Sequence, residues 1–518
     1  SGVENYGGGM VISGGEISGN EAYGIYSTSE LSVTGTTIRD NQETGLFISY
    51  SGPTDLANVT ITNNGLSGRG AGLQILRGVV TLADSHFTAN SNRAININGG
   101  ILRMDSSTIG AHTDGAIIIY AEAVVEMTDV EVSEIGTPGE WGAVIWNYGN
   151  LTLTGANLHD NGHVALYNDG PRAFAAIYDS QFRGNLANDN VVRNLGAATL
   201  LLSSTLIAEN QTGTGEAITS SSPLTMVNVT ISGNSNAGLR TRGEFDVSYT
   251  TIADNGGAGY FAEGATGANV ANVIVARNGG GDCLYELALA GSLSLGTNVD
   301  SDGSCGVSAT HSAPTLGLGP LADNGGSSFT HALAPVSPAA NIATGRCPSI
   351  DQRNYSRPFG PGCDLGAFEA GATALSFEAD EAEEDIDLAT AEPADDDSLI
   401  AIPNQNYNCR YGNSSAFDIA DTLLQGQEYL PVGIGPDSLW LQFEGPAFGE
   451  LCWAPTAGFV LWLNGRQIQV DQLPASLLRV INYPPLPPTA TPTPDPDESY
   501  DVTPTPSPTC DPQYQQCP

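Results

Sequence analysis

The segment from His159 to His163, with the sequence HDNGH, brings two imidazoles and the Asp160 carboxylate within five residues. Imidazole and carboxylate together are ligands that several transition metals accept. The same segment is also typical of a polar corner between two strands, because Asn and Gly favour turns. We favour the corner and expect no metal site here.

A second segment, NVDSDG at residues 298–303, places Asp300 and Asp302 two residues apart and ahead of a glycine. Oxygen ligands at alternate positions, followed by a glycine turn, resemble the start of a calcium loop. Residue 309 is Ala, where the twelfth position of an EF-hand would supply Glu. We favour an Asp-rich turn closed by Cys305 and leave calcium as the alternative ligand. No other cofactor is expected.

Carboxylates recur in the position before a repeated asparagine, at Asp40, Asp160, Glu209 and Asp254. Retaining glycosidases need two carboxyl groups about 5 Å apart. These four never fall on consecutive repeats, and the Asn-Thr-Asp, Gly-His-Gly and Arg-Ile-Lys motifs of polygalacturonases are missing. The adjacent aspartates at 395–397 lie outside the repeats. We therefore expect no catalytic residue.

The eight cysteines fall into four local pairs, which are Cys283 with Cys305, Cys347 with Cys363, Cys409 with Cys452, and Cys510 with Cys517. An even number without Cys-x-x-Cys spacing predicts disulfides and an oxidising compartment. The nearby His311 and His331 lack the spacing of a zinc site. We expect these local pairings and a secreted protein; the family resemblances given below imply a bacterial cell surface.

The composition excludes several function classes. The chain has 518 residues, 57 Asp and Glu against 17 basic residues, and a net charge of −40. All 17 basic residues are Arg, so no Schiff-base or phosphate-loop lysine exists. Nucleic-acid binding needs basic surfaces, and no apolar run approaches the roughly 18 residues of a membrane span.

A sequence motif close to Thr-x-Ile-x-x-Asn recurs along the first 280 residues. It ends at Asn20, Asn41, Asn64, Asn90, Asn161, Asn185, Asn210, Asn234, Asn255 and Asn278. His112 and Ile135 fill the two missing positions, so the mean period is about 23.5 residues, which is typical of a solenoid. Short β-branched runs separated by Gly, Asn, Asp and Ser predict three strands per repeat. We expect an all-β fold with a parallel β-helix of about 12 rungs over residues 1–282, in which Asn stacks at a corner.

The repeat region resembles the right-handed parallel β-helix family, which includes polysaccharide lyases, hydrolases and bacterial surface proteins. Residues 283–374 contain DNGGSSFTHALAPVSPAANIA and CPSIDQRNYSRPFGPGCDLGAFE. These segments resemble the closing part of choice-of-anchor β-helix surface proteins. The resemblance implies a disulfide-containing cap over the last rung, where Arg353 and Arg357 would pair with Asp364 and Glu369.

Three further regions follow. Residues 375–400 carry eleven acidic residues and no Arg, which predicts a solvated linker. Residues 401–482 resemble a bacterial SH3-like β module through Asn408-Cys409-Arg410-Tyr411-Gly412, which implies a cell-wall peptide or glycan as ligand. We place Trp440 and Trp453 in its core. Residues 483–518 are rich in Pro and Thr and predict an extended tail.

We expect a non-enzymatic extracellular protein with a structural or adhesive role. The sequence begins inside the repeat, and an uncovered first rung would be a template for self-association into a fibre or sheath. The alternative is a carbohydrate-binding or polysaccharide-cleaving β-helix. Aromatic side chains stacked on one face would favour this alternative, with Tyr120, Trp146 and Tyr167 as candidates. Asn58 and Asn228 begin glycosylation sequons, whose use depends on the source.

Overall fold

The computed structural model describes residues 1–373, with short gaps at 50–51, 69, 263–267, 286–296, 307–308, 311–312, 346 and 349, and the strands between Leu399 and Val480. The chain forms two compact units, residues 1–383 and 384–518. Each unit is described by itself below. Within the described residues, no helix is long and apolar enough to cross a membrane.

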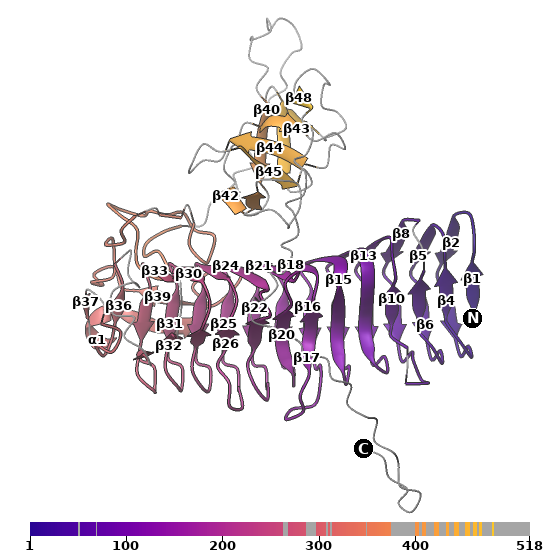
Figure 1. Ribbon diagram of the computed structural model, residues 1–518, viewed down its shortest axis with the longest axis horizontal. Helices are drawn as coiled ribbons and strands as arrows, with labels where there is room; N and C mark the ends of the chain where they lie inside the picture. Colours follow the sequence, from indigo (N-terminus) through magenta and orange to yellow (C-terminus); the bar gives the residue numbers. More distant parts are fainter. Residues whose placement is uncertain are drawn as a thin grey trace, which may run out of the picture. The chain divides into compact units, whose positions relative to one another are not determined.

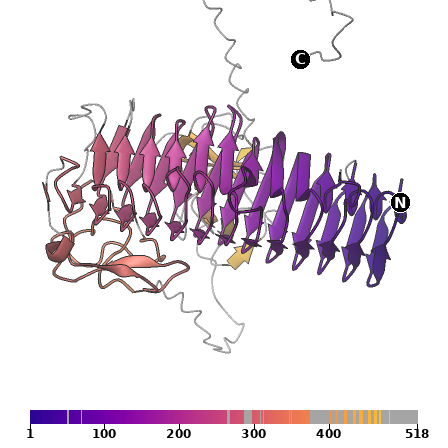
Figure 2. The ribbon, with the colours of Figure 1, turned by 90° about the horizontal axis from the view of Figure 1, so that it is seen from below.

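The first unit is a stack of similar turns, each of which contributes strands to three faces (Figures 1 and 2). Every strand pairs in parallel with the equivalent strand of the next turn; for example, Ile38 lies opposite Ile61, and Ile61 opposite Phe87. The unit is therefore a β-solenoid, as the period of the sequence predicts.

We number the faces in chain order. The strands of the first face are β1 (Val3–Asn5), β4 (Ile25–Ser27), β7 (Leu46–Ile48), β10 (Leu73–Ile75), the first halves of β13 (Arg93–Asp105) and β15 (Gly115–Thr128), β17 (Ala143–Asn147), β20 (Val164–Asp169), β23 (Val192–Leu195), β26 (Ile218–Ser220), β29 (Leu239–Thr241), β32 (Tyr260–Ala262) and β35 (Cys283–Tyr285).

The second face continues from the first, and in two turns a single long strand serves both. Its strands are β2 (Met10–Ser13), β5 (Leu31–Thr34), β8 (Thr54–Ala57), β11 (Val79–Ala83), the second halves of β13 and β15, β18 (Asn150–Thr154), β21 (Phe174–Tyr178), β24 (Thr199–Ser203), β27 (Leu224–Val227), β30 (Phe245–Ser248) and β33 (Ala268–Ala271).

The third face is a separate sheet of 14 short strands. They are β3 (Glu16–Ser18), β6 (Thr37–Arg39), β9 (Thr60–Thr62), β12 (His86–Thr88), β14 (Thr108–Gly110), β16 (Glu131–Ser133), β19 (Asn157–His159), β22 (Gln181–Arg183), β25 (Leu206–Ala208), β28 (Thr230–Ser232), β31 (Thr251–Ala253), β34 (Ile274–Ala276), β36 (Val299–Asp300) and β37 (Ala309–Thr310).

The interior of the solenoid is filled with apolar side chains. On each short strand of the third face the middle residue points inward, and Ile38, Phe87 and Phe182 are fully buried there. Because successive strand residues point to opposite sides, the residues on either side of them face outward. The same alternation makes rows of outward residues run along the faces, with a single row along the first face, where the middle residue of each short strand points outward.

The repeated asparagines form a buried ladder at one corner. The Asn185 side chain donates to Oδ1 of Asn210 (2.9 Å) and to the Leu158 carbonyl (3.0 Å), and its own Oδ1 accepts from Asn161. The residue before the ladder position has left-handed backbone, as at Asp160 with φ 52°. His112 and Ile135 occupy this corner in their turns, as predicted, because His112 contacts Asn90 and the Ile135 amide donates to Asn161.

The segment after residue 312 corrects the predicted position of the cap. It contains α1 (Ala313–Leu316) and an antiparallel pair, β38 (Leu318–Ala322) and β39 (Thr330–Leu333), and it folds back along the outside of the third face (Figure 2). The predicted covering of the last rung is therefore only part of the role of this segment, which also covers the third face. The outward residues explain this, since β25, β28, β31 and β34 carry Leu, Ala, Thr, Ser and Ile, whereas β3, β6, β12, β16, β19 and β22 each expose an Arg, Glu or His.

A second apolar cluster forms between this segment and the solenoid. It joins the outward Ala253, Ile274 and Ala276 to Leu318, Leu333, Leu365 and Phe368. Two polar contacts between distant parts of the chain add to it: Thr230 donates to Gln352, and Asn228 to the Ile350 carbonyl. The cap thus shares a core with the flank of the last turns and belongs to the same compact unit.

The ion pairs of the cap differ in part from the prediction. Arg357 and Glu369 are both fully buried and lie 3.4 Å apart, as expected. Arg353 instead pairs with the buried Asp351 at 2.6 Å, and it reaches Glu369 only through that residue's backbone carbonyl. The Asp364 carboxylate likewise accepts hydrogen bonds from the backbone amides of Asn341 and Ala370. Its role is therefore to bind backbone groups of the cap.

The structure contains the Cys283–Cys305 and Cys347–Cys363 disulfides that the sequence predicted. The first closes the end of the solenoid, because Cys283 belongs to β35 and Cys305 follows β36. The second closes the segment of the cap that holds Arg353 and Arg357.

The second unit consists of antiparallel strands with one parallel pair. Its strands are β40 (Leu399–Pro403), β41 (Tyr407–Arg410), β42 (Ile419–Leu423), β43 (Pro431–Ile434), β44 (Trp440–Glu444), β45 (Leu451–Pro455), β46 (Phe459–Leu463), β47 (Arg466–Ile468) and β48 (Arg479–Val480). Cys409 and Cys452 lie on β41 and β45, which pair through Arg410 and Trp453.

Several predictions fall on parts that the structure does not describe. The side chains of Cys409, Cys452, Trp440 and Trp453 lie outside the described residues, as do most of the linker 375–400 and the tail 483–518. The SH3-like identity of residues 401–482 stays a prediction.

The fourth cysteine pair belongs to that tail. Cys510 and Cys517 both lie outside the described residues, so the predicted disulfide between Cys510 and Cys517 also stays a prediction. The two disulfides of the first unit are thus the confirmed part of the predicted pairing.

Candidate functional site

Aromatic residues gather in the outward row of the first face. The residues in register along this row are Glu4, Tyr26, Phe47, Gln74, Asn96, Ile118, Trp146, Tyr167, Arg193, Thr219, Arg240, Phe261 and Leu284. Strands of neighbouring turns lie about 4.8 Å apart, so consecutive members of the row are direct neighbours. We call these thirteen residues the outward row.

Four aromatic rings meet at the middle of the outward row, and we call Trp141, Trp146, Tyr148 and Tyr167 the central aromatic group. The Trp146 ring lies 4.8 Å from Tyr167 and 5.1 Å from Trp141, measured between ring centroids. Tyr148 stacks on Trp146 at 6.4 Å with an interplanar angle of 19°. Trp141 is 62% exposed. The group therefore presents an apolar platform to solvent that is built from two neighbouring turns.

A buried histidine supports the loop that carries Trp141. The His163 ring is packed between Gly136 and Gly142, and a Cβ atom on either glycine would overlap it. His163 is almost fully buried, and burial lowers the pKa of its imidazole. A neutral ring therefore fills the space below residues 136–142 and holds Trp141 beside Trp146.

A second aromatic group lies at the start of the row and consists of Tyr6, Tyr23, Tyr26 and Phe47. Tyr26 stacks on Phe47 with centroids 5.4 Å apart, and Tyr23 lies 4.9 Å from Phe47. Gln74, Asn96 and Ile118 separate this group from the central one along the row. The outward row thus holds two aromatic platforms.

Polar side chains continue the outward row beyond Tyr167. Arg193 is paired with Asp189, and Arg240 with Glu216 at 3.2 Å. Glu216 also accepts from the Thr219 hydroxyl (2.7 Å) and the Asn190 amide (3.1 Å). The platform therefore borders a fixed network of hydrogen-bond donors and acceptors. A stacking surface beside such a network is chemically suited to bind a molecule with both apolar and hydroxylated faces.

The sequence predicted this site in part. Trp146 and Tyr167 are neighbours in the outward row, as the carbohydrate alternative required. Tyr120 lies off the row, 41% exposed, close enough to influence the hydroxyl of Tyr148. Trp141 and Tyr148 were missed because they lie in turns outside the repeat.

A sequence signal for the row exists in the repeats. An aromatic residue stands between two inward-pointing residues in Ile25-Tyr26-Ser27, Leu46-Phe47-Ile48, Ile145-Trp146-Asn147 and Leu166-Tyr167-Asn168. Aligning the turns on the inward residues would have placed all four aromatics in one row.

The structure separates the two histidines of the segment 159–163. His159 binds Glu131 through Nε2 and Asp160 through Nδ1, at 3.0 and 2.8 Å. These carboxylates outweigh the effect of partial burial and raise the pKa of His159. His163 is buried below the Trp141 loop instead. Within the described part of the chain no three metal-ligating residues cluster. The polar corner stays our interpretation of this segment.

The candidate calcium residues belong to a hydrogen-bonded turn. Asp300 accepts from the amides of Gly303 (3.2 Å) and Cys305 (2.7 Å), and Asp302 accepts from those of Asp282 and Ser304. Their oxygens thus face backbone amides. Asp300 and Asp302 thus close the turn before Cys305, and calcium stays the alternative ligand that the sequence analysis left open.

The carboxylates before the ladder asparagines are engaged by neighbouring cations. Asp40 binds Arg39, Glu209 binds Arg183 at 2.6 Å, and Asp254 binds Arg277 at 2.7 Å. Asp160 binds His159, as described above. The Glu209 and Asp254 contacts join successive turns, whereas Asp40 and Asp160 each bind the preceding residue of the same turn. None of these four contacts brings two free carboxyl groups together.

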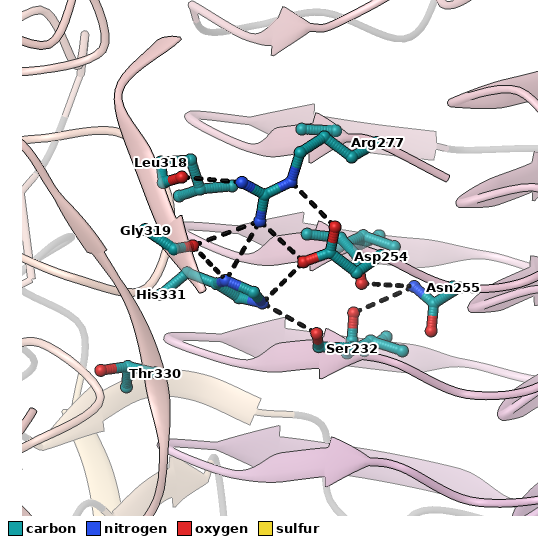
Figure 3. Close-up of polar contacts among 12 residues, drawn as sticks. Ser232, Asp254, Asn255, Arg277, Leu318, Gly319, Thr330 and His331 are labelled. Carbon is teal, nitrogen blue, oxygen red and sulfur yellow. Dashed lines mark hydrogen bonds and ion pairs between the residues drawn. The ribbon is translucent and has the colours of Figure 1, made fainter. Parts of the chain in front are cut away.

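Figure 3 shows a serine, a histidine and an aspartate in contact, at Ser232, His331 and Asp254. The Ser232 hydroxyl lies 2.8 Å from Nε2 of His331, and the Asp254 carboxylate approaches the same nitrogen at 3.9 Å. Nδ1 faces the Gly319 carbonyl at 2.8 Å. In a catalytic triad the carboxylate would bind the nitrogen opposite the serine.

The serine and the histidine of this cluster are also closed to solvent. Ser232 and His331 are each 1% exposed, and burial lowers the pKa of His331. Arg277 bridges Asp254 to the carbonyls of Leu318 and Gly319 (Figure 3). The cluster therefore attaches β38 and β39 to the third face.

One family model matches two parts of the chain. Residues 2–79 and 141–288 match the family model described as "Right handed beta helix region". No curated protein matches the chain.

Two solved structures are similar in fold. The crystal structure of pectate lyase Pel9A is 15% identical with a TM-score of 0.36, and the alignment covers 70% of this chain and 87% of that one. The second is a double mutant of the periplasmic alginate epimerase AlgG, 12% identical with a TM-score of 0.31, covering 56% and 74%. This chain contains a right-handed β-helix.

Proposed function

We propose that this protein is a non-catalytic, extracellular carbohydrate-binding protein whose β-helix holds a glycan on the central aromatic group. The observation that carries the proposal is the contact of four aromatic rings with the exposed Trp141 at their edge. Aromatic faces of this kind bind the apolar face of a sugar ring, and the neighbouring polar side chains bind its hydroxyl groups.

The proposal joins the adhesive role expected from the sequence to its carbohydrate alternative. A rod that binds glycan along one face is suited to adhesion. The two disulfides support a location outside the cytoplasm, since such bonds persist in oxidising compartments. The resemblance of residues 401–482 to wall-binding modules is in keeping with a bacterial cell surface. Self-association into a fibre stays a separate prediction, which electron microscopy tests.

The absence of catalysis is part of the proposal. Two of the described carboxylates near the platform, Asp189 and Glu216, are held by Arg193 and Arg240. Side chains restrained in this way are suited to bind hydroxyl groups and less suited to act as a matched acid and base across a glycosidic bond.

A glycan array followed by calorimetry on the purified full chain tests this function. We expect at least one oligosaccharide to bind, and Trp141→Ala and Tyr167→Ala each to lower its affinity tenfold or more. Val11→Ala, at an exposed apolar residue of the second face, is the matched control and should bind as the unaltered protein does.

Two outcomes would overturn the proposal. The first is the absence of binding across neutral and acidic glycans. The second is depolymerisation of a polysaccharide that stops in Glu216→Gln, which would establish an enzyme.

A further inference from the structure

We propose that the central aromatic group selects uncharged glycans and rejects polymers of uronic acids. This inference rests on the proposed function and adds the chemical class of the ligand. Its basis is the pairing of every arginine that the described contacts place beside the central aromatic group.

The arginines beside the platform are already neutralised. Arg193 is paired with Asp189 and lies over the Tyr167 ring, 5.6 Å from its centroid. Arg93, on the preceding turns, is paired with Asp114 at 3.2 Å. Recognition of a sugar carboxylate favours a guanidinium with free donors facing the ligand. These guanidinium groups are held by carboxylates of the protein itself.

The same pattern holds further along the outward row. Arg240 is paired with Glu216 and lies over the Phe261 ring at 4.5 Å. Both arginines of the row are therefore packed on an aromatic ring and joined to an acid. A sugar carboxylate would have to displace the protein's own carboxylate to reach either of them.

Acidic side chains also lie near the platform. Burial is the main cause that raises the pKa of Tyr167 and of Tyr148, and Asp169 raises both further. Arg172 is the arginine nearest in sequence to Tyr167. It is exposed in the turn after β20, and the acidic Asp169 stands shortly before it in the chain. Residues 1–282 as a whole contain 27 acidic residues and 11 arginines, which give a charge of −16. A polyanion is repelled by such a surface.

The polar network suits neutral hydroxyl groups instead. Asn190, Thr219 and Glu216 form one connected set of donors and acceptors at the edge of the row. A sugar hydroxyl can donate to the Glu216 carboxylate without bringing a net charge into the site. Another ring of the same oligosaccharide would stack on Trp141 or Trp146, because three turns separate Trp146 from Thr219 along the outward row.

The sharpest test compares ligands that differ only in charge. Polygalacturonate and alginate, each with its carboxyl-reduced derivative, are titrated against the full chain at 20 and 500 mM NaCl, together with a set of plain neutral polysaccharides. We expect at least one reduced or neutral polymer to bind at least tenfold more tightly than either acidic one. We also expect less than a twofold change of that affinity with salt.

Variants connect this selectivity to the paired arginines. Asp189→Asn and Glu216→Gln release Arg193 and Arg240, and the double variant should gain salt-sensitive binding of polygalacturonate. Trp141→Ala should lose the neutral ligand in either background. Tighter binding of an acidic polymer by the unaltered protein, weakened by salt, would overturn the inference while leaving glycan binding established. Failure of every polymer to bind would instead overturn the proposed function.

Discussion

The side-chain amide of Asn90 lies 3.2 Å from Nε2 of the buried His112, which takes the place of the ladder asparagine in its turn. An amide nitrogen can only donate, so Nε2 accepts and carries no proton. Burial lowers the pKa of His112 to about 4. The ladder is therefore intact only while this imidazole is neutral.

This relationship predicts an acid-sensitive solenoid. The unfolded chain takes up a proton at His112 below about pH 6.5, whereas the folded chain does so only near pH 4. The free energy of unfolding therefore decreases as the pH falls between these values, and His112 accounts for about 3 kcal/mol of this decrease. His112→Asn should remove this contribution to the acid-dependent loss of stability, because an asparagine at position 112 would continue the ladder. Urea unfolding at pH 7 and pH 4.5, followed by circular dichroism, measures the difference.

His86→Asn is the matched control for this prediction, because His86 is exposed on β12 and its side chain contacts Thr108 instead of a ladder residue. It should leave the pH dependence unchanged. If His112→Asn lost as much stability in acid as the unaltered protein, the assigned role of His112 would be wrong.

The asparagine ladder should be a major source of stability. Asn185→Ala leaves the side chain of Asn161 and the carbonyl of Leu158 without their partner in a buried corner. Each unsatisfied buried group costs about 1–3 kcal/mol, so we expect a loss of about 3 kcal/mol or more. Asn157→Ala, at a partly exposed outward position of β19, should cost less than about 1 kcal/mol. Equal thermal midpoints for the two variants would contradict this prediction.

The buried Arg357–Glu369 pair should decide whether the cap stays attached. Arg357→Met leaves Glu369 ionised and buried without its counter-charge, which costs about 3–5 kcal/mol. The cap should then be cleaved by protease faster than the β-helix. Arg172→Met removes a charge from an exposed turn and should change neither the midpoint nor the cleavage pattern. Proteolysis followed by mass spectrometry distinguishes the two.

The packing of His163 should control the glycan platform. A methyl group at Gly142 would overlap the His163 ring, so Gly142→Ala should displace the loop that carries Trp141. We expect a tenfold or greater loss of glycan affinity together with a changed near-ultraviolet circular dichroism spectrum. Gly110→Ala is the control, since a Cβ there meets only ordinary contacts. Unaltered affinity in Gly142→Ala would show that this loop does not position the ligand.

Much of the β-helix could be predicted because its turns repeat. Each turn must place one inward apolar residue per short strand and one asparagine at the corner, so the period is visible in the sequence. The same register identified His112 and Ile135 as substitutes in the ladder. The local cysteine pairs also followed from spacing, and the structure contains Cys283–Cys305 and Cys347–Cys363.

The tertiary structure decided the features that depend on contacts between distant residues. The cap covers the flank because the outward residues of β25 to β34 are small or apolar, and their partners lie about a hundred residues later in the chain. Trp141 joins the platform only because a loop outside the repeat packs over His163. The sequence by itself determined the repeating turn, since that is a local pattern. The binding face required the stacking of turns, which brings rings from separate repeats into contact and pairs each arginine of the row with an acid.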